Sequence, residues 1–319
     1  MHLLDIRNLK THFYTLEGVV KAVDDVSFTV DEGEAVGLAG ESGSGKSTVA
    51  LSVMRLIKPP GKVVSGQILY KGEDLLGKRI AQFDDVRWKE ISMIFQGAMN
   101  ALNPVYTVGN QIVEAITHHE GTSSTEAWKT AERLLGLVGI DSSRAHSFPH
   151  EFSGGMRQRA MIAMALALNP SLVIADEPTT ALDVIVERQI LDLIADLKRK
   201  LGLSILLITH DLSVISELCS KAVIFYAGQI AELSPVAAML KEPLHPYTRG
   251  LLDAFLRIDG EKEKLRPIAG NPPSLLNPPS GCRFHPRCPY AKGICSTEQP
   301  KLTDVGGRLV ACHLFTGAS

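Results

Sequence analysis

A glycine-rich segment of eight residues constrains this chain more than any other feature. Gly40 to Ser47 reads GESGSGKS and matches the pattern G-x4-G-K-[ST]. It follows an apolar run, AVGLAG, that predicts a buried strand, and it opens a helical pattern from Lys46 to Ile57. Glycines let backbone N–H groups curl around an anion, and the N-terminus of the helix adds positive potential. The sequence therefore predicts a phosphate-binding loop between a strand and a helix.

The side chains of this loop have separate expected tasks. Lys46 is expected to reach the β- and γ-phosphates of a nucleotide, and Ser47 to supply a hydroxyl to Mg²⁺. The alternative, a glycine-rich turn without a ligand, is disfavoured by the complete motif in this strand–helix context. The residues expected to bind nucleotide are Gly40, Ser42, Gly43, Ser44, Gly45, Lys46, Ser47 and Thr48.

A pair of acids ends a second apolar run. The segment SLVIADEP predicts a buried strand that finishes at Asp176 and Glu177. An acid at the end of a strand beside a phosphate-binding loop can hold Mg²⁺, directly or through water, and a second acid can polarise an attacking water. Asp176 is therefore expected to bind the metal and Glu177 to act as general base. The alternative is a pair of solvated acids at a strand end.

Strand and helix patterns alternate along most of the chain. The first 35 residues favour strands, and 157–168 and 184–201 favour helices. SILLITHD is a further buried strand, and KAVIFYAGQIAEL predicts a hairpin that turns at Ala227 and Gly228. Such alternation is typical of an α/β fold with a largely parallel sheet.

Composition excludes several classes of function. The chain has 319 residues, 45% of them hydrophobic, so it can bury a sizeable core and is not a wholly disordered chain. Lys and Arg number 33 against 35 Asp and Glu, which argues against a strongly basic nucleic-acid binder. No apolar run reaches the roughly 18–20 residues that cross a bilayer, and the first ten residues do not read as a secretory signal. We expect a cytoplasmic protein.

Further motifs follow in a fixed order. Ser153 to Gln158 reads SGGMRQ ahead of an apolar helical run, and Gln96 lies in MIFQGAMNALNP. Ala181-Leu182-Asp183 comes after the acidic pair, and His210 lies in LLITHDL. Together with the phosphate-binding loop and the acidic pair, this set resembles the ATPase subunits of ABC transporters over about residues 1–240.

The resemblance implies a role for each motif. It implies ATP and Mg²⁺ as cofactors, with Glu177, His210 and Gln96 in catalysis and with Ser47, Gln96 and Asp176 around the metal. Ser153, Gly154, Gly155 and Asp183 are expected to contact nucleotide. Ser153, Gly154 and Gly155, called the signature residues below, are expected to reach the γ-phosphate held by a partner ATPase. Either Phe13 or Tyr14 is expected to stack on adenine, the alternative being ordinary packing of an aromatic side chain in a strand.

The C-terminal part of the sequence indicates which branch of these ATPases the chain resembles. LHPYTRGLLDAF, GNPPSLLNPPSGCRFHPRCPYA and ACHLF are similar to the C-terminal extension of dipeptide and oligopeptide importer ATPases, with the D-type subunit of a dipeptide permease as the best match. The resemblance implies an ABC ATPase domain over 1–242, with a helical subdomain at about 97–165, and an extension over 243–319. The implied fold is a P-loop nucleotide-binding domain: a RecA-like mixed sheet, an antiparallel β subdomain, a helical subdomain and a small irregular cysteine-containing extension.

Four of the five cysteines lie near the C-terminus. Their spacing is C-x5-C-x6-C-x16-C, after a charged run at Glu261–Lys264 and a proline-rich stretch. Four thiolates suit a [4Fe–4S] cluster or a structural Zn²⁺, and the resemblance favours the cluster. The alternatives are plain buried thiols, or zinc with His285 or His313 as a ligand, whereas a disulfide framework is not expected in a reducing cytosol. The expected ligands are Cys282, Cys288, Cys295 and Cys312; Cys219, Trp88 and Trp128 are expected to be structural.

The resemblance also implies partners. We expect a heterodimer with a second homologous ATPase, bound to two transmembrane permease subunits at the cytoplasmic face of the cell membrane, with an external binding protein that delivers peptide. Nucleic acid is not an expected partner. Alternatives are the same motor for an oligosaccharide, nickel or glutathione, a non-transport ABC ATPase, and a binding module that has lost hydrolysis. The last is disfavoured because Glu177 and His210 are present.

Overall fold

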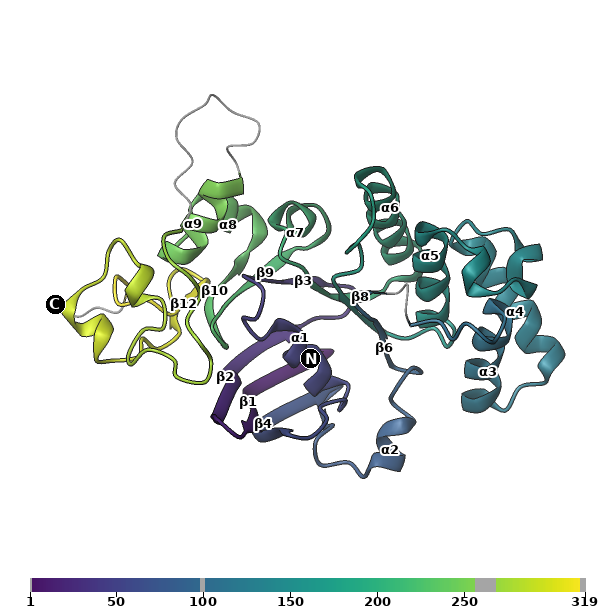
Figure 1. The fold of residues 1–319 in the computed structure, drawn as a ribbon, viewed down its shortest axis with the longest axis horizontal. Coiled ribbons are helices and arrows are strands. Elements are labelled where there is room, and N and C mark those ends of the chain that lie inside the picture. Colours follow the sequence, from purple (N-terminus) through teal and green to yellow (C-terminus); the bar gives the residue numbers. More distant parts are fainter. Residues whose placement is uncertain (1, 98–100, 256–267, 316–319) are drawn as a thin grey trace. The chain divides into compact units, whose positions relative to one another are not determined.

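The chain folds into two compact units in the computed structural model, which describes residues 2–97, 101–255 and 268–315. The first unit comprises residues 1–31, 35–76 and 207–319, and the second comprises 32–34 and 77–206. Figure 1 draws the elements of both. The charged run at Glu261–Lys264 lies outside the described residues. The expected boundary after residue 242 stays a prediction, since the C-terminal segment belongs to the same unit as the phosphate-binding loop.

An antiparallel sheet forms one layer of the first unit (Figure 1). Its strand order is β2-β1-β4-β5, with Leu4 on β1 opposite both Val30 on β2 and Tyr70 on β4. Alternate side chains of β1 and β2 are buried, as expected for a sheet with one face on the core. The strands are β1 (Leu4–Thr15), β2 (Gly18–Val30), β4 (Gly61–Tyr70) and β5 (Glu73–Asp74).

The phosphate-binding loop follows the most buried strand of the first unit's other sheet. β3 (Ala35–Ala39) is buried along its whole length and pairs in parallel with β9 (Lys221–Tyr226). β9 turns at Ala227 and Gly228 into antiparallel β10 (Gln229–Pro235), which confirms the predicted hairpin. The helices of this unit are α1 (Lys46–Val53), α7 (Leu212–Leu218), α8 (Val236–Lys241) and α9 (Pro246–Phe255).

The helix after the loop is shorter than predicted. The pattern predicts a helix to Ile57, but α1 ends at Val53. Arg55 adopts φ 51°, the left-handed conformation that commonly closes a helix, and the Leu56 N–H bonds back to the Leu51 carbonyl at 2.8 Å. Apolar spacing alone does not reveal this local termination.

The C-terminal segment contains few regular elements, as predicted, and adds to the sheet of the first unit. β12 pairs with β10 through Glu232 opposite Val310, and β11 pairs with β12. The described part of this segment also contains two short 3-10 helices. The elements are η4 (His285–Arg287), η5 (Gly293–Ser296), β11 (Thr303–Asp304) and β12 (Leu309–Val310).

The second unit holds two parallel strands and most of the long helices. β6 (Ile91–Ile94) pairs in parallel with β7 (Leu172–Asp176), both completely buried. β8 (Ser204–Ile208) contributes its first three residues to this unit and its last two to the other. Helices α3, α4 and α5 pack together (Figure 1), while the expected bounds of a helical subdomain, about 97–165, stay a prediction. The helices are α2 (Ile80–Asp84), α3 (Val108–Glu120), α4 (Ser124–Leu137), α5 (Gly154–Ala165), α6 (Val184–Leu201), η2 (Ser142–His146) and η3 (Pro149–Glu151).

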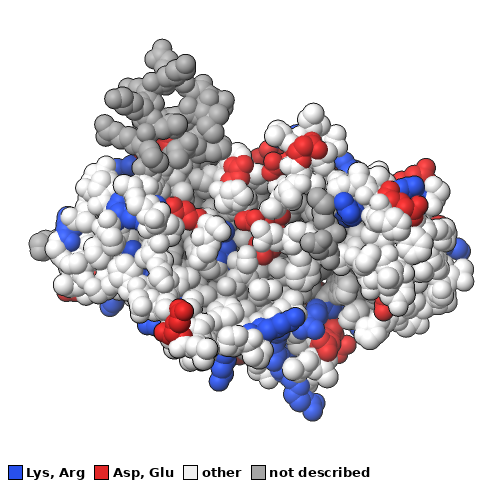
Figure 2. All heavy atoms as spheres, in the orientation of Figure 1, with Lys and Arg blue, Asp and Glu red and all other residues white. Residues whose placement is uncertain are grey.

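Two general features of the chain agree with the composition. Among the residues described, no helix has the length and apolar character to cross a membrane. Basic and acidic side chains are interspersed over the face drawn in Figure 2.

Candidate functional site

The phosphate-binding loop is shaped by two glycines that no other residue can replace without strain. Gly40 has φ 148°, and a Cβ there would lie 2.1 Å from the Phe225 carbonyl oxygen. Gly45 has φ 108°, and its Cβ would lie 2.0 Å from the Ala22 carbonyl oxygen. The loop is therefore pressed against the backbone of β2 and β9, which explains the glycines at these motif positions.

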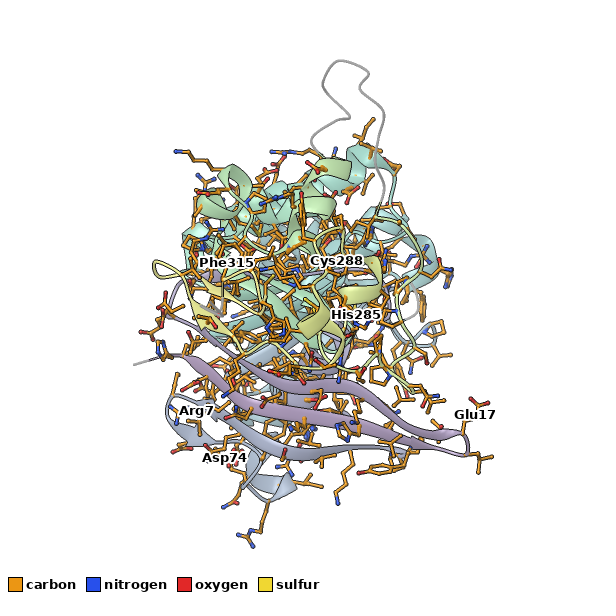
Figure 3. All side chains as sticks on the ribbon, turned by 90° about the vertical axis from the view of Figure 1, so that its left-hand side faces the viewer. Arg7, Glu17, Asp74, His285, Cys288 and Phe315 are labelled. Carbon is orange, nitrogen blue, oxygen red and sulfur yellow. The ribbon has the colours of Figure 1, made fainter. Side chains whose placement is uncertain are left out.

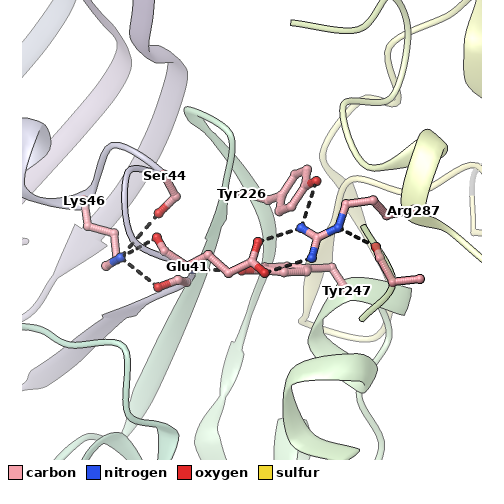
Figure 4. Close-up of polar contacts among 8 residues, drawn as sticks. Glu41, Ser44, Lys46, Tyr226, Tyr247 and Arg287 are labelled. Carbon is pink, nitrogen blue, oxygen red and sulfur yellow. Dashed lines mark hydrogen bonds and ion pairs between the residues drawn. The ribbon is translucent and has the colours of Figure 1, made fainter. Parts of the chain in front are cut away.

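Lys46 lies at the centre of the loop. Its side chain is buried, and Nζ donates hydrogen bonds to the Gly40 carbonyl (2.7 Å), the Glu41 carbonyl (2.9 Å) and the Ser44 hydroxyl (3.4 Å) (Figure 4). The lysine opens α1, so its ammonium adds to the positive end of that helix. This arrangement favours an anion such as a polyphosphate.

The predicted residues of the first unit that lie outside the loop are more exposed. Phe13 is half-buried, with its ring over Gly61, where a Cβ would lie 2.6 Å from Phe13 Cε1. Tyr14 is 50% exposed, and adjacent strand residues face opposite sides of the sheet. His210 is exposed just after β8. The prediction that one of the two aromatics stacks on adenine stays open.

In the second unit the structure brings Gln96 and Glu177 together. Asp176 is the buried last residue of β7, and Glu177 follows it with φ 45°, a conformation that costs a non-glycine residue energy. Gln96 Nε2 donates to Glu177 Oε2 at 2.7 Å, and the Thr180 hydroxyl donates to the same oxygen at 2.9 Å. The carboxylate is therefore held by two donors at the end of a buried strand, a geometry suited to a general base.

The signature residues form the first turn of α5. The predicted helix was 157–168, but α5 begins at Gly154, because the Ser153 side chain accepts the Met156 N–H (3.3 Å) as an N-cap. Asp183 caps α6 in the same way through the Val186 N–H (3.0 Å). Ser153 thus lies at a positive helix end, which suits phosphate, whereas the Asp183 carboxylate itself occupies the N-terminus of α6.

The predicted residues are divided between the units. The first unit carries the phosphate-binding loop, Phe13, Tyr14 and His210; the second carries Gln96, Asp176, Glu177, Asp183 and the signature residues.

Comparison with known proteins identifies the family. The ABC transporter family matches residues 23–180, and the C-terminal region of oligopeptide/dipeptide transporters matches 231–295. The oligopeptide transport ATP-binding protein AppD of Bacillus subtilis is 48% identical over 98% of this chain and 97% of its own length. The chain is an ABC transporter ATPase of the oligopeptide/dipeptide branch. OppD of Salmonella typhimurium is 45% identical over 97% of this chain and 93% of its own.

Solved structures agree with the ABC ATPase fold. The dimeric ATP-binding cassette MJ0796, bound to ADP and phosphate, is 28% identical with a TM-score of 0.65, covering 73% of this chain and 98% of its own. CbiO1 of Clostridium perfringens, 23% identical with the same TM-score, covers 76% of this chain and 91% of its own and supports the fold alone. The fold class predicted from the sequence is confirmed.

The four C-terminal cysteines of this ABC ATPase lie near one another. Burial raises the pKa of Cys282 to about 11 and also raises the pKa of Cys288 and Cys312. The Cys282 N–H donates to the Cys295 carbonyl at 2.8 Å. Figure 3 shows Cys288 near His285 in this segment. Within the described residues, however, no three His, Cys, Asp or Glu side chains are arranged to hold a metal ion. The cluster and the zinc alternative stay predictions.

Cys219 and the two tryptophans make structural contacts. Cys219 is buried, Trp88 donates to the Met164 carbonyl, and Trp128 stacks on His146, which confirms their predicted structural role. His285 and His313 hydrogen-bond to the carbonyls of Cys282 and Glu298.

Three residues around the phosphate-binding loop were not predicted. Glu41 lies within the motif, and Tyr247 and Arg287 reach it from distant parts of the chain. No local sequence pattern signals a contact between residues so far apart.

Proposed function

We propose that this ABC ATPase hydrolyses ATP to power the import of peptides through a binding-protein-dependent transporter. The observation that carries this proposal is the match along nearly the whole chain to oligopeptide transport ATP-binding proteins, together with the complete set of nucleotide motifs. The match includes the C-terminal region, which separates this branch from general ATP-binding cassettes.

The proposed reaction assigns a separate task to each nucleotide motif. Lys46 would bind the phosphates, and Ser47 and Asp176 would hold Mg²⁺, which would neutralise charge on the phosphates. Glu177, held by Gln96 and Thr180, takes a proton from the attacking water, and His210 orients that water against the γ-phosphate. Adenine stacks on Phe13 or Tyr14.

The proposed assembly is a heterodimer with a second ATPase. Ser153, Gly154, Gly155 and Asp183 would contact the nucleotide on the partner, and the N-terminus of α5 would add its positive end. The dimeric state of the MJ0796 cassette supports such a pairing. Two permease subunits would hold the dimer at the cytoplasmic face of the membrane, and closure around ATP would drive their rearrangement. Cargo such as an oligosaccharide, nickel or glutathione is the alternative.

Uptake by cells tests the cargo. Cells that lack the gene, and complemented cells, would be given labelled di- and tripeptides and, in parallel, labelled oligosaccharides, nickel and glutathione. We expect loss of peptide uptake alone, restored by the wild-type gene. Loss of another cargo alone would retain the motor and overturn the peptide assignment, and unchanged uptake of every cargo would overturn the transport function.

Substitution of Glu177 tests the chemistry. Glu177→Gln removes the general base but keeps the shape of the side chain, so we expect ATP turnover in the assembled transporter to fall about 100- to 10,000-fold with ATP binding retained. Glu187→Gln is the matched control, because Glu187 accepts a hydrogen bond from Thr179 in the same unit. Equal turnover in the two variants would contradict the assignment.

We also propose that Cys282, Cys288, Cys295 and Cys312 hold a [4Fe–4S] cluster, with Zn²⁺ as the alternative. What supports this is the donor set alone, four cysteines in a segment with few regular elements. The described residues bring no three of these side chains into an arrangement that could hold a metal ion. Cysteine thiolates suit either group. A bound metal group would stabilise a segment that has little core of its own.

Metal analysis of anaerobically purified protein tests this proposal. We expect about four iron and four sulfide per chain, retained in Cys219→Ser and lost in Cys288→Ser. Stoichiometric zinc without sulfide would select the alternative, and a protein lacking iron, sulfide and zinc would exclude both.

A further inference from the structure

Glu41, the second residue of the phosphate-binding loop, is held by contacts from the C-terminal part of the chain (Figure 4). Its carboxylate accepts two hydrogen bonds from the Arg287 guanidinium, Nη1 to Oε2 at 2.7 Å and Nη2 to Oε1 at 2.9 Å. Its backbone N–H donates to the Tyr247 hydroxyl at 2.9 Å. The two-pronged geometry fixes direction as well as distance.

Arg287 is itself fixed in place. Its side chain is only 6% exposed, its Nε donates to the Ala269 carbonyl at 2.9 Å, and its Nη1 also donates to the Tyr226 hydroxyl at 3.3 Å. Glu41 holds the pKa of this guanidinium above its usual value. The ion pair is therefore largely shielded from solvent, unlike surface pairs that contribute little.

Tyr247 is equally constrained. It is fully buried, and its ring packs against Tyr226 and Phe284 with centroid distances of 4.6 and 5.4 Å. Burial raises the pKa of its hydroxyl, so the phenol stays neutral near pH 7. Its oxygen is held where it accepts the Glu41 N–H.

Glu41 connects these anchors directly to Lys46. The carbonyl of Glu41 accepts bonds from Lys46 Nζ at 2.9 Å and from the Ser44 N–H at 3.2 Å. The N–H and the carboxylate of Glu41 thus bind the C-terminal part of the chain, and its carbonyl binds the loop. The backbone on which the phosphates would sit is pre-formed by this residue.

We propose that Arg287 and Tyr247 are positioning residues for ATP binding, which hold the phosphate-binding loop in its binding conformation through Glu41. The inference rests on the proposed function. Neither residue needs to touch nucleotide; they reduce the ordering that the loop would undergo when ATP binds, and pre-organisation of this kind raises affinity.

Glu41→Gln distinguishes positioning from simple electrostatics. Removal of a negative charge beside a polyphosphate site should strengthen ATP binding if charge alone matters. Loss of the Arg287 pair should weaken it if positioning dominates. We expect the dissociation constant for ATP to rise about threefold to tenfold, within the range of one or two hydrogen bonds.

Conservative variants of Tyr247 and Arg287 test the effect on ATP binding without leaving a cavity in the core. Tyr247→Phe keeps the ring and removes only the hydroxyl, and Arg287→Lys keeps the charge and removes the fork. Each should raise the dissociation constant about twofold to tenfold. The double variant Glu41→Gln/Arg287→Lys should bind about as well as the weaker single variant, because both changes break one contact.

Arg308→Gln is the matched control. Arg308 also joins the C-terminal segment to a buried glutamate, with Nη2 2.8 Å from Glu232 Oε1, but it makes no described contact with the phosphate-binding loop. We expect this variant to lower the thermal midpoint and leave ATP affinity unchanged. If these contacts contributed to stability alone, Arg308→Gln would change ATP affinity to the same extent as the variants of Glu41, Tyr247 and Arg287.

The experiment is a titration of the full-length chain with a fluorescent ATP analogue, with the thermal midpoint of each variant, and the KM and kcat of the assembled transporter. We expect KM for ATP to rise with kcat within about twofold, since the groups around Glu177 are unaltered. Stronger binding by Glu41→Gln, or unchanged binding by Tyr247→Phe and Arg287→Lys, would overturn the inference. Failure of the wild-type chain itself to bind ATP, judged against Lys46→Ala, would instead overturn the proposed function.

Discussion

His245 is a buried titratable side chain close to the anchors of the phosphate-binding loop. Its Nδ1 accepts the Tyr247 backbone N–H at 3.0 Å, and the His245 backbone N–H donates to the buried carboxylate of Glu232 at 2.8 Å. Burial lowers the pKa of the ring to about 4, against the opposing effect of Glu232. The folded protein therefore keeps this imidazole neutral over the physiological range.

Acidification should cost stability through this residue. The pKa of His245 is lower in the folded state than the usual 6.5, so the unfolded chain binds more protons below pH 6.5 and stability falls as the pH falls. We expect a loss of about 2 kcal/mol in the free energy of unfolding between pH 7 and pH 5. Denaturant unfolding at both pH values checks this: His245→Gln should lose that part of the dependence, whereas the exposed His150→Gln should retain it.

At the scale of elements, the two helices that begin at predicted contact residues pack closely at their N-termini. Ser153 caps α5 and Asp183 caps α6. Gly155, in the first turn of α5, lies so near α6 that an added Cβ would be 2.6 Å from Val186 Cγ1. A glycine in the signature motif thus has a packing reason within this chain, apart from any contact with nucleotide.

Gly155→Ala should be destabilising because the new methyl group overlaps with Val186. We expect a loss of about 1–3 kcal/mol in the free energy of unfolding, the usual cost of overpacking. The double variant Gly155→Ala/Val186→Ala should recover part of that loss, since it removes the atom in conflict. Chemical denaturation of the single and double variants measures this; the absence of recovery would show that overlap with Val186 is not the cause of the loss.

At the scale of the whole molecule, the sequence could predict whatever lies close together along the chain. The phosphate-binding loop, the acids at the end of β7 and the β9–β10 hairpin are local patterns tied to turn chemistry and burial. The hydrogen bond from Gln96 to Glu177 joins residues that follow different strands, and only the family resemblance implied a catalytic role for Gln96. The predicted start of α5 lies three residues too late, because two glycines, which are untypical of a helix, form its first residues after the cap at Ser153.

The C-terminal contacts were beyond prediction for a physical reason. The sequence around an arginine does not indicate which distant residue it will pair with. The fold of a segment with few regular elements depends on tertiary contacts rather than on periodicity. Arg283, for example, is buried and pairs with Asp24 on β2 and with the Ala227 carbonyl. Such contacts place the cysteine-containing segment within the same compact unit as the phosphate-binding loop.

The pair formed by Glu41 and Arg287 spans 246 positions of the chain. A ribosome that adds 5–20 residues per second makes Arg287 roughly 10 to 50 seconds after the GESGSGKS motif. A nascent chain, or one released early, therefore carries the nucleotide motif without the anchor that shapes it. Under the proposed positioning role, full affinity for ATP is acquired only after Arg287 has been synthesised and has paired with Glu41, so that chains ending before Arg287 compete poorly for nucleotide.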